Sequence, residues 1–222
     1  MKQAFTTFLF IFIAATSALG QANKGLGKSD PAAKKILDEV SAKFKTYKSV
    51  KANFTLKIEN AAGKAQGTKT GAVQMKGAKY RVALDGQDII CDGKTIWTYD
   101  KAAKEVQIST LDNSSGSITP QKLFTNFYDK DFLYILNEEK KVGAKTIQVI
   151  ELTPIDKSKP FFKVLIEVDK AAKTIISTKV FEKNGNRYTY SVSSMTTNAE
   201  IPDASFSFDP KKFPGVEVID LR

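Results

Sequence analysis

The chain alternates apolar and polar residues in short runs that are separated by turn-forming residues. The clearest run is 50–59, where Phe54, Leu56 and Ile58 share one face. Such period-two alternation predicts half-buried β-strands. Further strands are expected at 71–76, 79–84, 87–91, 95–100, 105–109, 145–152, 163–169, 175–182, 186–195, 205–208 and 215–219. Because tight turns join most of these runs, we expect an antiparallel meander that curls into an incomplete barrel around a pocket.

Residues 118–136, ITPQKLFTNFYDKDFLYIL, interrupt this alternation. Thr119-Pro120 is a suitable helix start, with a hydroxyl N-cap and proline in the first turn. Apolar residues then recur at helical spacing: Leu123, Phe124, Phe127 and Tyr128. A second apolar cluster, 132–136, follows directly. A short helix this rich in aromatic residues must cover apolar surface on the strands. It is either a core-covering helix or a lid over a cavity, and the spacing is the same for both.

A second helix is expected from Asp30-Pro31 to about Tyr47, since Asp30 is a favourable N-cap. Its apolar residues form one stripe: Ile36, Leu37, Val40 and Phe44. The interval 60–68 is expected to be a loop. With two helical elements and one large β component, the predicted fold class is α+β: a curled antiparallel sheet that forms an unclosed β-barrel with a helical lid over an apolar cavity.

The N-terminus has the features of a targeting segment. Lys2 precedes an apolar run at 8–15, and small residues in Ala18-Leu19-Gly20 predict cleavage before Gln21. The apolar run is too short to span a membrane. We therefore expect residues 1–20 to be a signal peptide, cleaved near Gly20, and residues 21–222 to form a single exported domain, periplasmic if the organism is bacterial.

The composition argues against catalysis. The sequence has no histidine, which removes the usual general base and the usual zinc ligand. The single cysteine, Cys91, lies in a strand-like run and is expected to be a small buried apolar group. Gly-rich phosphate loops, CxxC and GxSxG motifs do not occur. We expect no enzyme activity, no catalytic residues, no cofactor and no metal.

The chain carries a formal net charge of +10, or about +9 once Lys2 is removed with the targeting segment. Arginine occurs only at Arg81, Arg187 and Arg222. Nucleic-acid binders rely heavily on arginine, so no nucleic-acid partner is expected. Lysines are spread along every segment, which is typical of a solvated surface. They also allow weak attraction to anionic lipid headgroups or acidic partners.

An apolar pocket without metal ligands suits an apolar ligand such as an acyl chain. The expected lining is aromatic and aliphatic, although each of these residues is equally compatible with an ordinary core: Phe54, Leu56, Tyr80, Trp97, Tyr99, Leu123, Phe124, Phe127 and Phe132.

Two motifs resemble the LolA family of periplasmic outer-membrane lipoprotein carriers. DGKTIWTYD at 92–100 is similar to that family's DGxxLWxYxP strand pair. FSFDP at 206–210 with GVEVID at 215–220 is similar to its FxFxPPxGVxVxD ending. Thr119-Pro120 and Leu123 match its lid region. The order and spacing hold across nearly the whole chain after residue 20.

The resemblance implies a chaperone whose unclosed β-barrel holds lipoprotein acyl chains beneath a helical lid. Its implied partners are acylated lipoproteins, an inner-membrane ABC transporter complex that loads it, and an outer-membrane acceptor. A monomer is expected, because the cavity must stay accessible. The family's lid-latching Arg-Pro pair is replaced here by Gly77-Ala78. Arg81, in Tyr80-Arg81-Val82, takes the lid-control role instead, or no residue does.

Two other functions compete with the carrier. One is a periplasmic lipid- or lipoprotein-sensing regulatory module with the same fold, for which we expect a second domain or a membrane anchor. The other is a hydrolase, which lacks a nucleophile–base pair in this sequence.

Overall fold

The computed structural model describes residues 29–111 and 128–222. This part of the chain contains two α-helices, α1 (Pro31–Lys45) and α2 (Tyr128–Asp131). Its strands are β1 (Val50–Glu59), β2 (Ala65–Lys76), β3 (Lys79–Leu84), β4 (Gln87–Cys91), β5 (Thr95–Asp100), β6 (Glu105–Thr110), β7 (Phe132–Val142), β8 (Lys145–Pro154), β9 (Phe161–Asp169), β10 (Thr174–Glu182), β11 (Arg187–Thr197) and β12 (Glu217–Asp220). Two 3-10 turns, η2 (Asp203–Phe206) and η3 (Pro210–Lys212), precede β12.

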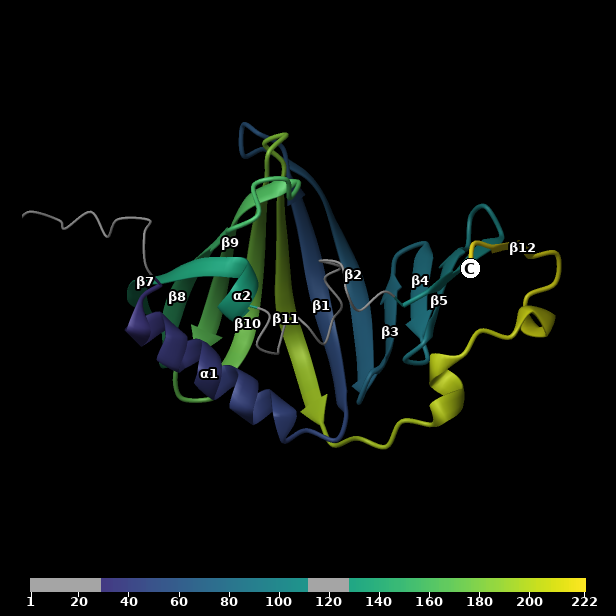
Figure 1. Cartoon of the computed structure of the whole chain (residues 1–222), viewed down its shortest axis with the longest axis horizontal. Coiled ribbons are helices and arrows are strands. Elements are labelled where there is room, and N and C mark those ends of the chain that lie inside the picture. The colour runs from purple at the N-terminus through teal and green to yellow at the C-terminus, as the bar shows by residue number, and fades with distance from the viewer. Residues whose placement is uncertain (1–28, 112–127) are drawn as a thin grey trace, which may run out of the picture.

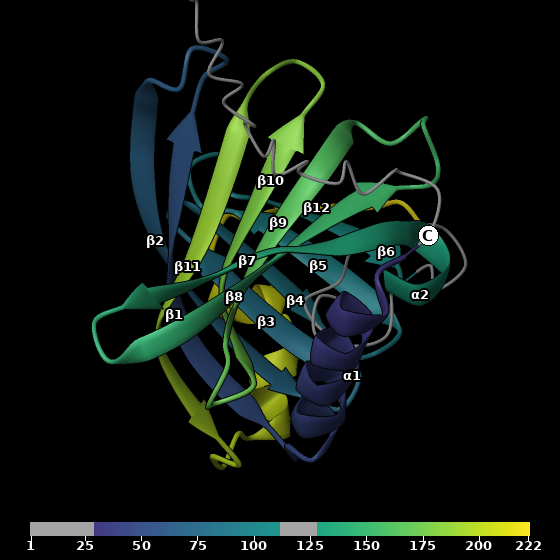
Figure 2. The same cartoon turned by 90° about the vertical axis from the view of Figure 1, so that its left-hand side faces the viewer.

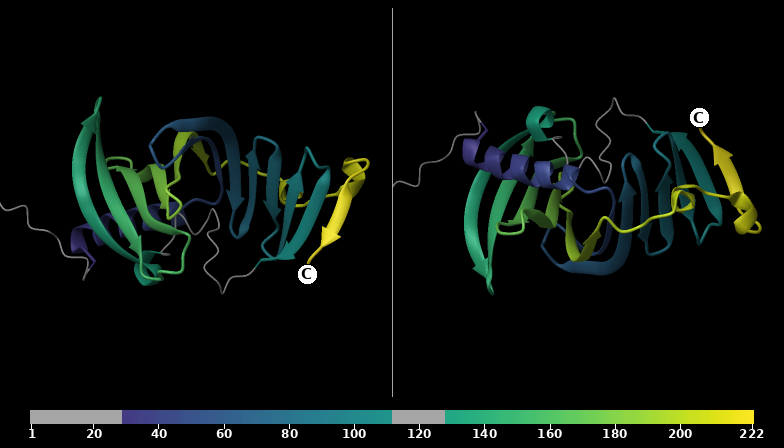
Figure 3. Two further views of the ribbon diagram at one scale, coloured as in Figure 1. Left: turned by 90° about the horizontal axis from the view of Figure 1, so that it is seen from above. Right: turned by 90° about the horizontal axis from the view of Figure 1, so that it is seen from below.

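All these strands belong to one sheet, in the order β12-β6-β5-β4-β3-β2-β1-β11-β10-β9-β8-β7. Two antiparallel meanders, β1–β6 and β7–β11, are joined where β1 pairs with β11. The sheet curls, but its edge strands β7 and β12 lie at opposite ends of the molecule, so the barrel stays open (Figure 1). Figure 3 shows the same opening from above and below. The predicted fold class is confirmed, with one exception to the antiparallel pattern: β12 runs parallel to β6.

Three predicted element boundaries are wrong. The apolar cluster 132–136 belongs to a strand, β7, and the helical part of the described segment is limited to α2. The expected loop 60–68 is shorter, because β2 already begins at Ala65. The expected strand 205–208 is replaced by η2, which ends at Phe206. The helix expected over 119–127 lies outside the described residues, as does the signal peptide.

Helix α1 forms as its sequence predicts. The Asp30 side chain accepts a hydrogen bond from the Ala32 amide at 2.8 Å, and Pro31 occupies the first turn. Ala33, Leu37 and Val40 are buried along one stripe. The backbone amide of Asp30 also donates to the Tyr134 carbonyl of β7, which fixes the helix start against the sheet. No helix in the described ranges is long and apolar enough to cross a membrane.

The sheet has an inner face, which α1 covers, and an outer face (Figure 2). On the inner face, α1 packs with α2 and β7–β10 around a first core cluster that includes Leu37, Ile150 and Ile166. A second inner cluster contains Val50, Met75 and Cys91, and Phe44 of α1 packs against it. One helix therefore covers parts of both meanders.

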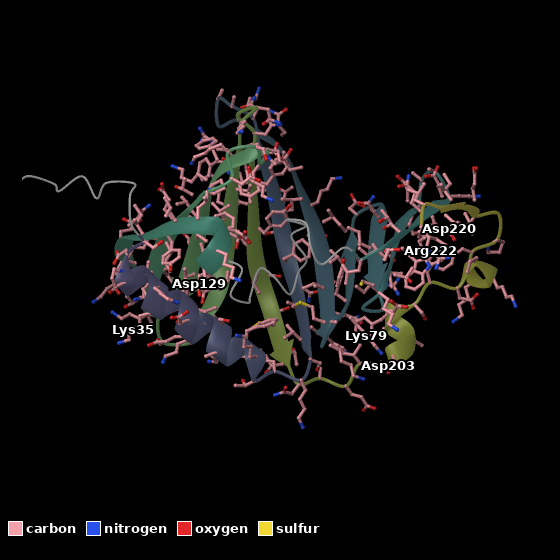
Figure 4. The ribbon with its side chains drawn as sticks, viewed as in Figure 1. Lys35, Lys79, Asp129, Asp203, Asp220 and Arg222 are labelled. Carbon is pink, nitrogen blue, oxygen red and sulfur yellow. The ribbon has the colours of Figure 1, made fainter. Side chains whose placement is uncertain are left out.

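The outer face of β4–β6 is covered by the C-terminal segment, residues 198–216. Phe208 and Phe213 stack with ring centroids 4.6 Å apart, and both rings contact Tyr99 of β5. Ion pairs tether the segment, since Asp203 lies 2.9 Å from the Lys76 ammonium and 3.2 Å from that of Lys79 (Figure 4). The segment therefore closes a third cluster on the side opposite to α1.

Replacing Phe208 by alanine should lower the free energy of unfolding by about 3–5 kcal/mol, because it empties the centre of this aromatic cluster. Urea denaturation followed by fluorescence measures the loss. Val218→Ala in β12 is the control: its side chain is 46% exposed, and we expect a change below about 0.5 kcal/mol. Equal effects of the two substitutions would show that the C-terminal segment contributes no packed core.

Candidate functional site

The candidate site is the inner face of β1–β5, where strand register aligns apolar side chains. Val50, Ala52 and Phe54 of β1 are paired with Met75, Val73 and Gly71 of β2. The alignment continues into β3, β4 and β5 through the pairs Val73–Val82, Val82–Ile89 and Cys91–Ile96. Directly paired residues point to the same face of a sheet. The inner face therefore carries apolar side chains on all five strands, interrupted where Lys69 is paired with Leu56 and Thr98 with Ile89.

Part of the inner face is tightly filled. Between α1 and β10–β11, the space bordered by Phe44, Tyr47, Ile175 and Met195 has a volume of only about 10 Å³. That volume holds no more than a single water molecule. Under α1 the packing is therefore that of a core.

The remainder of this face is only half-buried. Its half-buried apolar side chains are Phe54, Val73, Val82, Ile89, Ile96 and Val192. The Phe54 ring contacts Gly71 closely: a Cβ at that glycine would come within 2.4 Å of the ring. The glycine thus lets an aromatic ring pack directly against the neighbouring strand.

The two buried polar groups of this face, Tyr80 and Cys91, are neutral. Burial raises the pKa of the Tyr80 hydroxyl, and the nearby Cys91 thiol adds to the effect. Burial also raises the pKa of Cys91, which is fully buried. Both side chains keep their protons at neutral pH, so this surface carries no charge at that position. Within residues 29–111 and 128–222, no group of three potential metal ligands occurs.

Polar contacts join the two helical elements. The Tyr128 hydroxyl of α2 donates to Asp38 of α1 at 2.9 Å, and the Lys34 ammonium lies 3.1 Å from both Asp38 and Asp129. Figure 4 labels Asp129 at this junction. The Lys34 and Asp38 side chains are each more than 40% exposed. Exposed ion pairs are screened by water and stabilise little, so these ion pairs are weak compared with the core below them.

The predicted site residues fall into three groups. Phe54, Leu56, Tyr80 and Phe132 lie on the inner face, Phe132 at the far end beside Phe161. Trp97 and Tyr99 do not join them, because they belong to the outer-face cluster beneath the C-terminal segment. The third group lies outside the described residues: Leu123, Phe124 and Phe127. Their role in ligand binding stays a prediction for all nine.

Arg81 also lies on the outer face, one position from Tyr80. Its guanidinium is 2.6 Å from one carboxylate oxygen of Asp88, and the Lys101 ammonium is 2.9 Å from the other. Burial acts to raise the pKa of Asp88, but hydrogen bonds from Lys101 and Arg81 outweigh it and hold that pKa below its usual range. Lid control by Arg81 stays a prediction, and the residue's observed contact is with a buried carboxylate.

Sequence reasoning missed several residues of this surface. Val73, Val82, Ile89 and Val192 were not among the predicted site residues. The available signal was alternation in register with Phe54 and Tyr80: once one residue of a paired strand is assigned to the inner face, every second residue follows.

A larger open groove, of about 540 Å³, lies where β2 approaches the β3–β4 turn, and Phe54 and Gly71 of the candidate site also line it. Its lining further includes polar residues: Asn53, Thr55, Thr70, Lys101 and Ser193. Asn53 and Thr55 alternate with the inner-face residues of β1, so they point to the opposite face of the sheet. The groove is far larger than the space bordered by Phe44 and Met195.

Comparison with known proteins identifies relatives across most of the chain. A family model described as "Outer membrane lipoprotein carrier protein LolA" matches residues 45–209. An outer-membrane lipoprotein carrier protein from Pectobacterium carotovorum is 28% identical over 188 residues, covering 83% of this chain and 87% of that protein. One from Photobacterium profundum is 26% identical over 189 residues, with 83% and 88% coverage.

A solved structure of an uncharacterised conserved protein from Thermus thermophilus superimposes with a TM-score of 0.57. The match covers 85% of this chain and 99% of that one at 12% identity. At this identity the likeness concerns the fold alone.

Replacing Asp88 by asparagine should destabilise the protein by about 2 kcal/mol at pH 7, because two cations lose a charged acceptor. The pKa of Asp88 is lower in the folded state, so its carboxylate stabilises the fold above the unfolded pKa of about 3.9 and less so as the pH falls through the folded value. The unfolding free energies of wild type and variant should therefore approach each other as the pH falls below about 4, and become equal only below the folded-state pKa of Asp88. The exposed Asp85→Asn variant is the control, and a pH-independent difference for Asp88→Asn contradicts the assignment.

Proposed function

Because this chain belongs to the LolA family of outer-membrane lipoprotein carrier proteins, we propose that it carries acylated lipoproteins through the periplasm by covering their acyl chains. The observation that supports the proposal most directly is the half-buried apolar surface of β1–β5, with its neutral polar groups. The family match supplies the class of cargo, and the inner face supplies a surface of suitable chemistry.

The energetic need for such a carrier is large. Each methylene group withdrawn from water contributes about 0.8 kcal/mol, so a long acyl chain is on the order of 10 kcal/mol more favourable when covered. A flat apolar sheet face lowers the free energy of acyl chains without selecting one chain geometry. We infer that lipoproteins of varied sequence are accepted, since the shared acyl group is what contacts the protein.

In this proposal an inner-membrane ABC transporter complex loads the carrier and an outer-membrane acceptor receives the cargo. Residues 1–20 act as the signal peptide, and residues 21–222 form one carrier domain that works as a monomer. The carrier performs no chemistry and needs no cofactor. Cargo transfer follows from differences in acyl affinity between successive partners.

The ion pairs between α1 and α2 are exposed and break at low cost, but Tyr128 of α2 is buried in the first core cluster, so opening the cover must also expose that ring. Opening there gives cargo access to the inner face while the sheet stays intact. The filled core under α1 remains as the fixed support of the cover.

The carrier function is tested by native mass spectrometry of the mature protein co-expressed in the periplasm with a triacylated lipoprotein. A complex is expected with the acylated cargo and not with its non-acylated Cys→Ser form. Phe54→Gln should weaken the complex about tenfold or more, since it removes an apolar ring from the binding face. Thr55→Gln, one residue along β1 and on the outer face, is the matched control.

Two outcomes oppose the proposal. Equal complexes with acylated and non-acylated cargo mean that the acyl chain is not what is bound. A bound free fatty acid or phospholipid, with no lipoprotein under any condition, points instead to a lipid sensor or small-lipid binder with this fold.

The lid-control role of Arg81 has a separate test in the same assay. If Arg81 controls the lid, Arg81→Leu changes cargo uptake or release while Asp88→Asn, which removes its partner, changes them in the same direction. If Arg81 only neutralises Asp88, both variants lower the unfolding free energy and leave uptake and release as in the wild type. The second result removes Arg81 from the transport mechanism.

A further inference from the structure

Three turns meet at one end of the sheet, and we name them together the three-turn tip: residues 60–64, 155–160 and 183–186. The Lys183 amide donates to the Pro160 carbonyl at 2.9 Å, and the Lys183 ammonium donates to the Lys157 carbonyl. On the other side, a Cβ at Gly185 would lie 2.5 Å from that of Ala61. Figures 1 and 2 show the turns after β1 and β10 together at the upper end of the sheet. The tip is therefore one contiguous surface formed by distant parts of the chain.

The tip displays large apolar side chains to solvent. Ile155 is 51% exposed and Phe162 is 48% exposed. The register shift between β9 and β10 places Phe162 outside the regular pairing, while its neighbour Phe161 stays buried in the core. Phe162 contacts the Phe181 ring at 6.2 Å between centroids. Two consecutive phenylalanines thus have opposite environments, one in the core and one in water.

Cations lie against the Phe181 ring, which Phe162 contacts. The Lys163 ammonium lies 4.8 Å from the centroid of the Phe181 ring, that of Lys179 lies 5.5 Å away, and the Arg187 guanidinium carbon lies 5.7 Å away. Basic residues outnumber acidic ones by eight to three in 57–64, 155–163 and 179–187. The basic residues are Lys57, Lys64, Lys157, Lys159, Lys163, Lys179, Lys183 and Arg187, and the acidic ones are Glu59, Asp156 and Glu182.

We propose that the three-turn tip docks on an anionic lipid bilayer, with Ile155 and Phe162 at the level of the headgroups and the surrounding lysines against lipid phosphates. Aromatic and aliphatic side chains ringed by lysine are suited to this interface, because lysine stems lie along apolar material while their ammonium groups reach the phosphates. The excess positive charge of the tip is complementary to the negative charge of the lipid phosphates. Docking at the tip leaves the inner face of β1–β5 uncovered. This membrane docking does not depend on the proposed lipoprotein carriage.

A bilayer fits the tip better than an acidic protein does. Ile155 lies on a turn of the tip and Phe162 lies beside it at the start of β9, and both are exposed. Burying an exposed phenylalanine or isoleucine is favourable at any position on a fluid lipid surface. A protein partner instead requires a complementary pocket for each side chain.

Sedimentation with vesicles of phosphatidylethanolamine and phosphatidylglycerol tests the proposal on the mature chain. Binding is expected to these vesicles, and to be much weaker for pure phosphatidylcholine or at high salt. The double variant Ile155→Ser with Phe162→Ser should bind about tenfold or more weakly. Val142→Ser is the matched control, since Val142 is 57% exposed in the β7–β8 hairpin at the other end of β8, and its binding should equal that of the wild type.

The charge contribution has its own pair of variants. Lys157→Gln with Lys159→Gln should weaken binding on the order of 20-fold at low salt, since each lysine near an anionic surface contributes about fivefold. Lys94→Gln with Lys141→Gln removes the same charge from exposed positions away from the tip. An equal loss in both pairs would mean that only net charge matters, and it would overturn the assignment to the tip.

Insertion depth gives a readout that folding defects do not imitate. Cys91 is fully buried, so an environment-sensitive fluorophore can be attached selectively at Ser158→Cys in the tip or at Ala144→Cys in the β7–β8 turn. Anionic vesicles should shift the emission of the Ser158→Cys conjugate to the blue and leave that of the Ala144→Cys conjugate unchanged. No shift at either position, or no vesicle binding by the wild type, overturns the proposal and would leave the tip as a candidate contact for an acidic protein.

Discussion

The pairing of β1 with β11 is the interaction on which the rest of the structure depends. It turns two separate meanders into one sheet with one continuous inner face. Ten residues of β1, Val50 to Glu59, pair along β11, and a register shift after Asn53 accommodates the curl. Because the inner face is continuous, a single helix can cover parts of both meanders. Without this ladder, α1 would pack on β7–β10 alone and the apolar side chains of β2–β5 would have no facing partner.

A curled sheet with apolar side chains on both faces must be covered on both, and the chain uses two different segments for this. Helix α1 fills the inner face over β7–β10. The C-terminal segment, with Phe208 and Phe213, covers the outer face of β4–β6 at the other end. The two covers are diagonally arranged, and the inner face of β1–β5 lies between them with its apolar side chains half-buried. The proposed binding surface is therefore the part of this face whose side chains stay half-buried, beside the buried residues Val50, Met75 and Cys91.

The sequence predicts much of this architecture, because alternation and turn residues are local signals. Asp92-Gly93 and Asn184-Gly185 mark hairpins, and the N-cap of α1 lies at Asp30 as its residue type indicates. The assignment of faces is different. Alternation shows that Trp97 and Tyr99 share a face, but not that the C-terminal segment, a hundred residues later, would cover that face. For the same reason, the sequence alone does not show that Arg81 pairs with Asp88, because that contact depends on how β3 and β4 are aligned. The continuous apolar run at 132–136 has neither the period of a helix nor that of a strand, so the sequence alone does not identify β7.

The separation of β1 from β11 along the chain has a consequence for how the protein reaches its native state. Asn53 and Ser194 hydrogen-bond across this ladder although they are 141 positions apart. Contacts of such high contact order form late and slowly, because a long loop must close before they stabilise anything. A chain that emerges from its N-terminus first therefore has its helix and first meander long before the sheet can be joined. The continuous inner face that spans both meanders is complete only when almost the entire polypeptide is present, although β1–β5 themselves end at Asp100.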